Sequence, residues 1–282
     1  MRERMRFGVA LGRLNPAFHL DVTREAERLG FESVWLPEHL IFPLAMAGSP
    51  HPGADHPPVP PRTPVFDAFA YLSFLAGCTS RIRLGTHVYL LGLRHPFVAA
   101  RAIQTLDRVS GGRAEIGIGA GWLASEWRAA GLDFRTRGRR LDEAIDVCKR
   151  LFSEDVVEHH GEFFDFGPVC FEPKPLQRPW PPLHVGGESE AALRRAARVA
   201  EGWIGLDHRA ETVRGPLERL HALRARAETA DGAFCVTVGA ASPSRSEVEA
   251  LARAGVDRLI VCPWNRSPEA MEGLRAFAET MF

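Results

Sequence analysis

Residues 112–126 read GRAEIGIGAGWLASE and combine a short apolar run with alternating glycines. A dinucleotide-binding fingerprint requires glycine at its first, third and sixth positions, between an early strand and a closely packed helix. Gly117 and Gly119 match the first two positions, but the sixth is Trp122, whose indole is too large for a contact between helix and strand. The stretch instead predicts a strand whose end is thinned by glycine, so that a flat molecule can approach the backbone. The alternative is that these glycines only relieve crowding inside a barrel.

Seven further runs of β-type residues flank this one and alternate with segments of helical periodicity. The candidate strands are Phe7–Leu11, Ser33–Leu36, Ile82–Leu91, Ala114–Gly119, Leu183–Gly186, Gly202–Gly205, Phe234–Gly239 and Arg258–Cys262. Three of the expected helices are Ala17–Leu29, Phe97–Ser110 and Leu141–Phe152. Repeated βα units of this number predict an α/β fold, a parallel (β/α)8 TIM barrel. A chain of 282 residues suits one such barrel, so we expect a single domain over 1–282.

Two segments interrupt the alternation of strand and helix. Phe42–Pro64, after the second strand, is rich in proline and glycine, and Glu154–Pro182, after the fourth, is typical of a hairpin followed by proline-rich coil. If both leave the carboxyl ends of barrel strands, they lie where barrel active sites are built. We expect lids or substrate walls there; unstructured surface insertions are the alternative. We expect these walls to contain the aromatic side chains of Phe42, Trp122, Phe163 and Phe164. Such walls favour an apolar or aromatic substrate.

The overall charge and the cysteines exclude several classes of protein. The 35 basic and 35 acidic residues balance, so the chain lacks the basic field that binding to nucleic acid or an anionic membrane requires. The 5 cysteines are odd in number and include no CxxC pair, which argues against a disulfide framework or zinc ribbon. Without a secretory or membrane-spanning run, the sequence predicts a cytoplasmic protein that acts on a small molecule.

A candidate phosphate site follows the fifth strand. There Gly186 and Gly187 lead through Glu188 to Ser189, which precedes a helix of good periodicity. Free backbone N–H groups at the start of a helix, reached through small residues, form a cradle for phosphate. The alternative is a plain turn in which Glu188 and Glu190 complement the helix dipole.

A candidate proton-transfer group ends the second strand. His39 can reach the mouth of a barrel from there, and imidazole titrates near neutrality. The neighbouring Glu38 is expected to orient this ring or to raise its pKa; the alternative is a structural histidine. The paired histidines elsewhere lack a third ligand at metal-site spacing, so no metal is predicted. The run Arg135–Arg140 is expected to be the solvated start of a helix.

Taken in order, these segments resemble the luciferase-like monooxygenase superfamily, and within it the branch of oxidoreductases that depend on coenzyme F420, a deazaflavin. The resemblance covers nearly the whole chain and rests on AERLGFESVWLPEHL (26–40), RIRLGTHVYLLGLRHPFVAARAIQTLDRVSGGRAEIGIGAGW (81–122), RRLDEAIDVCKRLF (139–152), PPLHVGGESEAALRRAARVAEGWIG (181–205) and GVDRLIVCPW (255–264). It implies a TIM-type barrel, usually a homodimer, that holds a flavin or deazaflavin ring at its C-terminal mouth.

The resemblance also implies roles for single residues. Gly186, Gly187, Glu188 and Ser189 match the phosphate cradle, and His39 aligns with a histidine near the reactive face of the ring. Thr86, His87 and Val88 match a segment that commonly carries a non-prolyl cis peptide supporting the ring. The positions beside the ring are matched by Gly119, Gly121 and Trp122. The family's DGW-like motif is matched at Trp203. Because some F420-dependent dehydrogenases have a carboxylate where Trp122 stands, oxidation of a sugar phosphate is not expected.

The resemblance therefore predicts an F420-dependent oxidoreductase that transfers a hydride between the deazaflavin and a small organic substrate. His39 would give or take the accompanying proton. One alternative is an FMN-dependent monooxygenase, in which reduced flavin reacts with oxygen in the same pocket. A second is a barrel that binds flavin without turnover.

Overall fold

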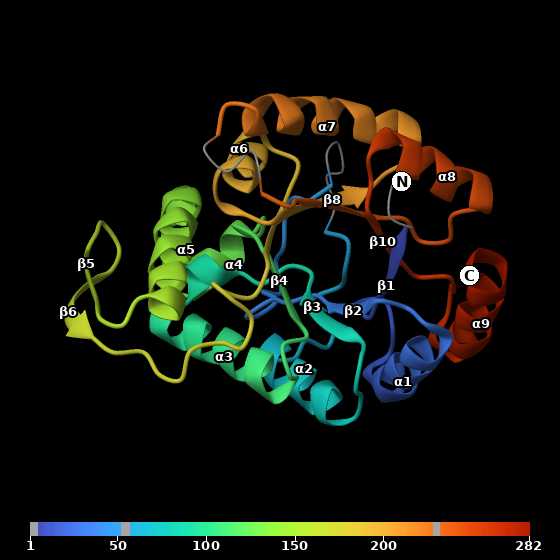
Figure 1. Cartoon of the computed structure of the whole chain (residues 1–282), viewed down its shortest axis with the longest axis horizontal. Coiled ribbons are helices and arrows are strands. Elements are labelled where there is room, and N and C mark those ends of the chain that lie inside the picture. Colours follow the sequence, from blue (N-terminus) through green and yellow to red (C-terminus); the bar gives the residue numbers. More distant parts are fainter. Residues whose placement is uncertain (1–4, 52–56, 228–231) are drawn as a thin grey trace.

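A computed structural model describes residues 5–51, 57–227 and 232–282 of the chain. Eight parallel strands close into a barrel in the order β1-β10-β9-β8-β7-β4-β3-β2, which confirms the predicted α/β barrel (Figure 1). The strands are β1 (Arg6–Ala10), β2 (Ser33–Leu36), β3 (Arg83–Thr86), β4 (Ala114–Ile118), β7 (Leu183–Gly186), β8 (Gly202–Asp207), β9 (Cys235–Gly239) and β10 (Arg258–Val261). The third strand is shorter than the predicted Ile82–Leu91, because the chain turns through a cis peptide at His87–Val88 into a short 3-10 helix at Leu91–Leu93.

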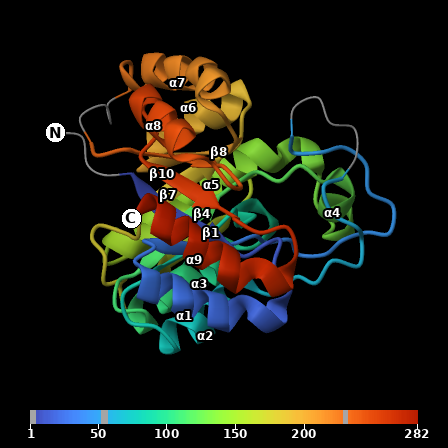
Figure 2. The same ribbon diagram turned by 90° about the vertical axis from the view of Figure 1, so that its right-hand side faces the viewer.

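Helices surround the barrel (Figures 1 and 2). They are α1 (His19–Leu29), α2 (Ala68–Gly77), α3 (Pro96–Val109), α4 (Ala124–Ala129), α5 (Arg137–Ser153), α6 (Glu190–Val199), α7 (Ala210–Arg224), α8 (Arg245–Ala254) and α9 (Ala270–Met281). Helix α5 begins before the predicted Leu141, because Asp133 caps a 3-10 turn at Phe134–Thr136 that runs directly into it. Among the helices of the described residues, none is long and apolar enough to cross a membrane.

Side chains fill the interior of the barrel below its mouth. Trp35 is fully buried, donates from Nε1 to Ser33 Oγ at 2.8 Å, and occupies the space that Gly8 and Gly85 leave open. Under it, the buried carboxylate of Glu115 accepts a hydrogen bond from His184 and forms an ion pair with Arg258. Trp35 is among the residues that line the cavity above it, so this packing provides the floor of the mouth.

The two insertions lie in different places. The segment between β2 and α2 stands out on the same side of the molecule as α4 (Figure 2), and much of it lines the mouth; its residues 52–56 are outside the described part. The hairpin formed by β5 (Val157–His160) and β6 (Asp165–Val169) lies beside α5, away from the barrel (Figure 1). No described residue of 154–182 lines the mouth. The prediction that this second insertion forms a substrate wall is therefore wrong, because it follows α5 and not the end of a barrel strand.

Candidate active site

A cavity of about 1240 Å³ opens at the carboxyl ends of the barrel strands and is walled by the segment between β2 and α2. The cavity brings together most of the predicted site residues: Glu38, His39, His87, Val88, Gly119, Gly121, Trp122, Gly186, Gly187, Glu188 and Ser189. The aromatic wall differs from the prediction. Phe42 and Trp122 contribute to it, and Phe66 and Phe134 join them, but Phe163 and Phe164 do not because they belong to the hairpin beside α5.

Val88 explains two of the glycines. The peptide bond that joins it to His87 is cis, as the resemblance implies. A Cβ atom on Gly119 would lie 2.6 Å from Val88 Cγ2, and one on Gly186 would lie 2.8 Å from Val88 Cγ1. The glycines at the ends of β4 and β7 therefore make room for a protein side chain, and Val88 and these glycines together form one surface of the cavity.

Thr86 and Trp203 do not reach the cavity. Both are fully buried: Thr86 Oγ1 donates to the carbonyl of Gly117 at 2.7 Å, and Trp203 Nε1 donates to the carbonyl of Gly187 at 2.9 Å. The expectation that they contact a cofactor is corrected accordingly. Thr86 ties β3 to β4, and Trp203 holds the turn after β7 from below.

The turn after β7 has the features of an anion cradle. Gly187 has a φ of 121°, in the left-handed region that favours glycine. Ser189 caps α6 by accepting from the N–H of Ala192 at 3.2 Å, and the N–H groups of Glu188 and Ser189 have no acceptor among the described residues. These donors lie where a helix N-terminus attracts negative charge.

Glu188 braces this turn with its side chain. Its Oε1 accepts from the N–H of Leu206 at 2.8 Å and from Nε2 of His208 at 3.1 Å. Burial opposes ionisation, but these hydrogen bonds outweigh it and hold the pKa of Glu188 below its usual range. The carboxylate thus joins the cradle to the end of β8.

His39 has a partner that the sequence did not suggest. Its Nδ1 lies 2.9 Å from Oε2 of Glu126, which is fully buried on α4. Its ring lies 4.5 Å from that of Phe42 and 5.8 Å from that of Trp122, measured between centroids. A carboxylate in the first turn of the helix after the glycine-rich strand was the available signal for Glu126.

Glu38 does not orient His39, contrary to the expectation. Its Oε1 pairs with the guanidinium of Arg94 at 2.5 Å, and its Oε2 accepts from the N–H of Leu90 at 2.9 Å. Consecutive residues after a strand point in different directions, so adjacency in sequence did not make Glu38 and His39 partners. Glu38 instead fixes the connection between β3 and α3.

Two other histidines that line the cavity, His19 and His87, are held neutral. Burial lowers the pKa of His87 to about 4. Burial also lowers the pKa of His19, although its Nε2 lies 3.1 Å from the carbonyls of both Leu11 and Leu14. At neutral pH these two imidazoles therefore carry no charge.

One side of the cavity is lined by arginines. Arg135, Arg137 and Arg139 border it around the start of α5. The side chains of Arg135 and Arg139 are 88% and 63% exposed and pair with Asp133 and Glu162, so this is a solvated helix start, as predicted, that also borders the mouth. Arg195 on α6 also lines the cavity and is buried, with its guanidinium paired to Asp142 at 2.7 Å. Arg195 additionally donates to the carbonyl of Gly138, so the start of α5 lies against α6.

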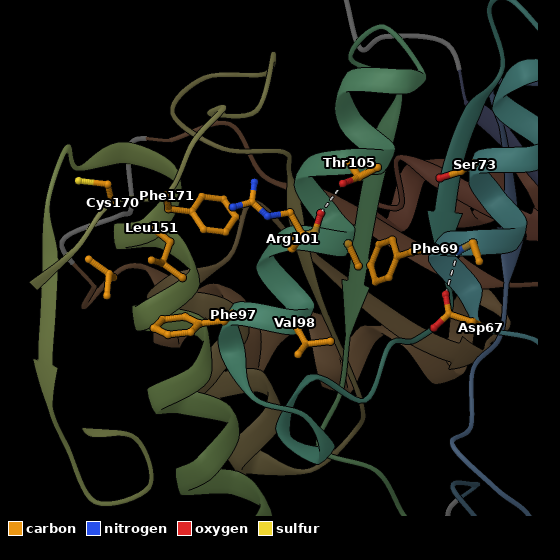
Figure 3. Close-up of a pocket in the computed structure, with 13 residues that line it drawn as sticks. Asp67, Phe69, Ser73, Phe97, Val98, Arg101, Thr105, Leu151, Cys170 and Phe171 are labelled. Atoms are coloured by element: carbon orange, nitrogen blue, oxygen red, sulfur yellow. Dashed lines mark hydrogen bonds between the residues drawn. The ribbon is translucent and has the colours of Figure 1, made fainter. Parts of the chain in front are cut away.

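A second cavity of about 760 Å³ lies outside the barrel, between α2, α3 and the hairpin (Figure 3). Its lining is mostly apolar and includes Phe69, Phe97 and Phe171, with the guanidinium of Arg101 4.1 Å above the centre of the Phe171 ring. It shares no described residue with the mouth of the barrel.

A family model described as luciferase-like monooxygenase matches residues 5–278. The relatives that are similar to this chain in sequence include the following three. An uncharacterized protein of Mycobacterium tuberculosis is 31% identical over 201 residues, covering 71% of this chain and 69% of the relative. The FMNH(2)-dependent dimethylsulfone monooxygenase of Pseudomonas putida is 33% identical over 182 residues, 63% of this chain and 48% of the relative. The F420-dependent glucose-6-phosphate dehydrogenase of Kineococcus radiotolerans is 32% identical over 202 residues, 68% and 55% respectively.

Solved structures share the architecture over nearly the whole chain. Monooxygenase RslO1 of Streptomyces bottropensis has a TM-score of 0.77 at 22% identity and covers 98% of both chains. The coenzyme F420-dependent tetrahydromethanopterin reductase of Methanopyrus kandleri has a TM-score of 0.77 at 16% identity and covers 99% of both chains. At these identities the likeness shows the fold alone.

Proposed function

The chain belongs to the luciferase-like monooxygenase family and is an oxidoreductase of that family; from this premise we propose that it uses coenzyme F420 to transfer a hydride to or from a small organic substrate. The observation that carries the proposal is that one cavity joins the anion cradle at Gly187, the glycine-thinned strand ends and His39. The F420-dependent relative from Kineococcus supports the choice of cofactor. Membership of an enzyme family argues against the alternative of a flavin-binding barrel without turnover.

The residues present fit such a cofactor. A volume of about 1240 Å³ exceeds that of an ordinary small-molecule pocket, about 300–1,000 Å³. The phosphate would be held by the N–H groups of Glu188 and Ser189, which have no acceptor among the described residues. The tricyclic ring would be held against Val88, Gly119 and Trp122. A Cβ atom on Gly187 would lie 3.1 Å from that of Ala192, so a larger residue would crowd the cradle.

The protein's own contribution is placement, exclusion of water and proton transfer. When bound, a deazaflavin supplies or accepts a hydride. His39 presents an imidazole to the same cavity and gives or takes the proton of the substrate within hydrogen-bond reach. Phe42 and Trp122 flank this imidazole and exclude water from it. The apolar walls favour an apolar or aromatic substrate. With Trp122 beside His39 in place of a carboxylate, we do not propose the sugar-phosphate oxidation of the Kineococcus relative.

The second candidate is FMN-dependent monooxygenation, which the relative from Pseudomonas putida favours.

The two reactions can be told apart by the fate of the hydride and of oxygen. The F420 reaction moves a hydride between cofactor and substrate, whereas the FMN reaction consumes oxygen. The test uses reduced F420 that carries deuterium on the ring carbon that replaces the reactive nitrogen of flavin. The protein is incubated with this cofactor and a panel of small apolar carbonyl compounds and alkenes. We expect deuterium in the reduced product without consumption of oxygen. A product formed only with reduced FMN and oxygen, and no transfer of deuterium, would support the second candidate.

We further propose that the enzyme is a homodimer, formed through the outer face of α2 and α3. Helix α2 has the sequence AFAYLSFLAG and is apolar on all sides, which is typical of a helix that is covered on all sides. Yet Phe74 on α2 is 50% exposed and Val98 on α3 is 61% exposed. The apolar cavity of Figure 3 opens on this same face. A second copy of the chain would cover these residues.

A further inference from the structure

We propose that Glu126 is a positioning residue for His39: it keeps the hydrogen of the neutral imidazole on Nδ1, so that Nε2 faces the cavity as the proton acceptor. The consequence for turnover depends on the proposed function, whereas the tautomer itself does not. The assignment follows from which atoms can donate. A backbone N–H can only donate, and a carboxylate oxygen in this position can only accept.

Three donors converge on the Glu126 carboxylate. Its Oε1 accepts from the N–H of Leu40 at 2.6 Å and from that of Ile41 at 3.3 Å. Its Oε2 lies 2.9 Å from Nδ1 of His39 and is left to accept from that nitrogen. Because a neutral imidazole carries one N–H, a hydrogen on Nδ1 leaves a lone pair on Nε2.

The same carboxylate fixes the direction of the ring. By holding the backbone of Leu40 and Ile41, Glu126 fixes the point where the chain leaves β2 and enters the long insertion. The imidazole is then held between Phe42 and Trp122, with its side chain only 15% exposed. Within the described residues Nε2 has no hydrogen-bond partner, so it is available to a substrate proton.

The hairpin repeats this construction away from the cavity and supplies a matched control. There the carboxylate of Glu143 lies 3.0 Å from Nε2 of His159 and accepts from the N–H groups of Phe163 and Phe164. None of these residues lines the mouth of the barrel. The Glu143 side chain is 13% exposed, so its substitution removes a similar, mostly covered carboxylate without touching the proposed site.

The tautomer of the neutral ring can be read directly by nitrogen NMR of protein labelled in its histidine rings. In the wild type we expect His39 to carry its hydrogen on Nδ1. In Glu126→Gln the amide oxygen can still accept from Leu40 and Ile41, while its NH₂ group faces Nδ1 and forces that nitrogen to accept. We therefore expect the hydrogen on Nε2 in the variant. A wild-type His39 with its hydrogen on Nε2, or an unchanged tautomer in the variant, would overturn the proposal.

Turnover and cofactor binding then separate positioning from folding. In Glu126→Gln we expect kcat for substrate oxidation, the direction in which Nε2 accepts the proton, to fall by about 10²–10⁴-fold, as in other sites that hold the wrong tautomer, with cofactor Kd within about twofold of wild type. Glu143→Gln should leave kcat unchanged, and Glu126→Gln should cost nothing further in a His39→Ala background. A variant with the altered tautomer and wild-type kcat would contradict the positioning role. Absence of any F420 turnover in the wild type, with the tautomer as stated, would refute only the proposed function.

Discussion

The cradle depends on one backbone conformation, that of Gly187. Its φ of 121° is rarely adopted by a residue with a side chain, and its carbonyl accepts the buried indole N–H of Trp203. Because the turn is braced from below by Trp203 and beside it by Glu188, its N–H groups are fixed before any anion arrives. Preorganised donors of this kind avoid the cost of ordering a loop on binding.

Gly187→Ala should therefore weaken cofactor binding more than it weakens the fold. The control is Gly131→Ala, because Gly131 also has a positive φ, of 76°, but lies outside the cavity with no atom near its missing Cβ. Both substitutions should lower the free energy of unfolding by about 1–3 kcal/mol. Only Gly187→Ala should raise Kd for the cofactor, by at least about tenfold. Equal Kd values for the cofactor in titrations of the two variants would contradict the assignment of the turn at Gly187 as the phosphate cradle.

Among the elements, β3, β4 and β7 form the surface against which the ring is proposed to lie. The strand ends approach closely because Val88 fits into the spaces left by Gly119 and Gly186. Gly117 serves a related purpose, since a Cβ atom there would collide with the carbonyl of Thr86. All three glycines therefore relieve crowding: Gly117 against the backbone of Thr86, and Gly119 and Gly186 against the side chain of Val88.

Gly119→Ala should force Val88 out of its position. We expect a loss of about 1–3 kcal/mol in the free energy of unfolding, together with weaker cofactor binding, because an added methyl group overpacks this contact. Adding Val88→Ala should restore most of both quantities, since it removes the colliding Cγ2 atom. Denaturant unfolding and cofactor titration of the two single variants and the double variant measure the coupling. Strictly additive effects would show that Val88 does not fill this space.

Local patterns predicted the helices and strands well, because strand and helix periodicity and the positions of glycine and proline are signals that span only a few residues. The eight strands and the cavity residues 186–189 are examples. Contacts between distant residues could not be predicted in this way. His39 meets Glu126 and Glu38 meets Arg94 only after β2, β3 and β4 align in the barrel. The hairpin was misplaced for a different reason: α4 and α5 follow β4, so the chain has left the strand end before the hairpin begins.

Across the whole molecule, a buried ionic layer supports the cavity from below. Glu115 pairs with His184, Arg83 and Arg258, and Arg258 also pairs with Glu32 at 2.7 Å. Burial opposes the charge of Glu115, but hydrogen bonding to His184 and the nearby cations outweigh it and depress the pKa of that carboxyl. Removing one member of such a layer leaves the charges of the other members buried without partners.

Glu115→Gln should lower the free energy of unfolding at pH 7 by about 3–5 kcal/mol. Because the folded-state pKa of Glu115 is depressed, its contribution is present above its ordinary pKa near 4.5 and is lost as pH falls toward the folded value. The difference between wild type and variant should therefore be smaller at about pH 3.5 than at pH 7. Urea unfolding at the two pH values tests this, and a difference that grows on acidification would contradict it.

The proposed homodimer can be tested by placing a charge on the face where the two copies would meet. Val98→Glu places a charge on the exposed face of α3, where desolvation would oppose association. Light scattering after gel filtration should report a dimer for the wild type and a monomer for this variant. Val156→Glu is the control, because Val156 is 54% exposed but lies outside α2 and α3. A wild-type monomer, or a dimer that survives Val98→Glu, would argue against this interface.

We propose that the cavity at the mouth of the barrel binds a deazaflavin. This is tested by equilibrium titration of the purified protein with F420, and separately with FMN, with binding followed by quenching of ligand fluorescence. We predict saturable F420 binding with Kd in the micromolar range or below, and weaker binding of FMN. Failure of both cofactors to bind at micromolar concentration would contradict the proposal.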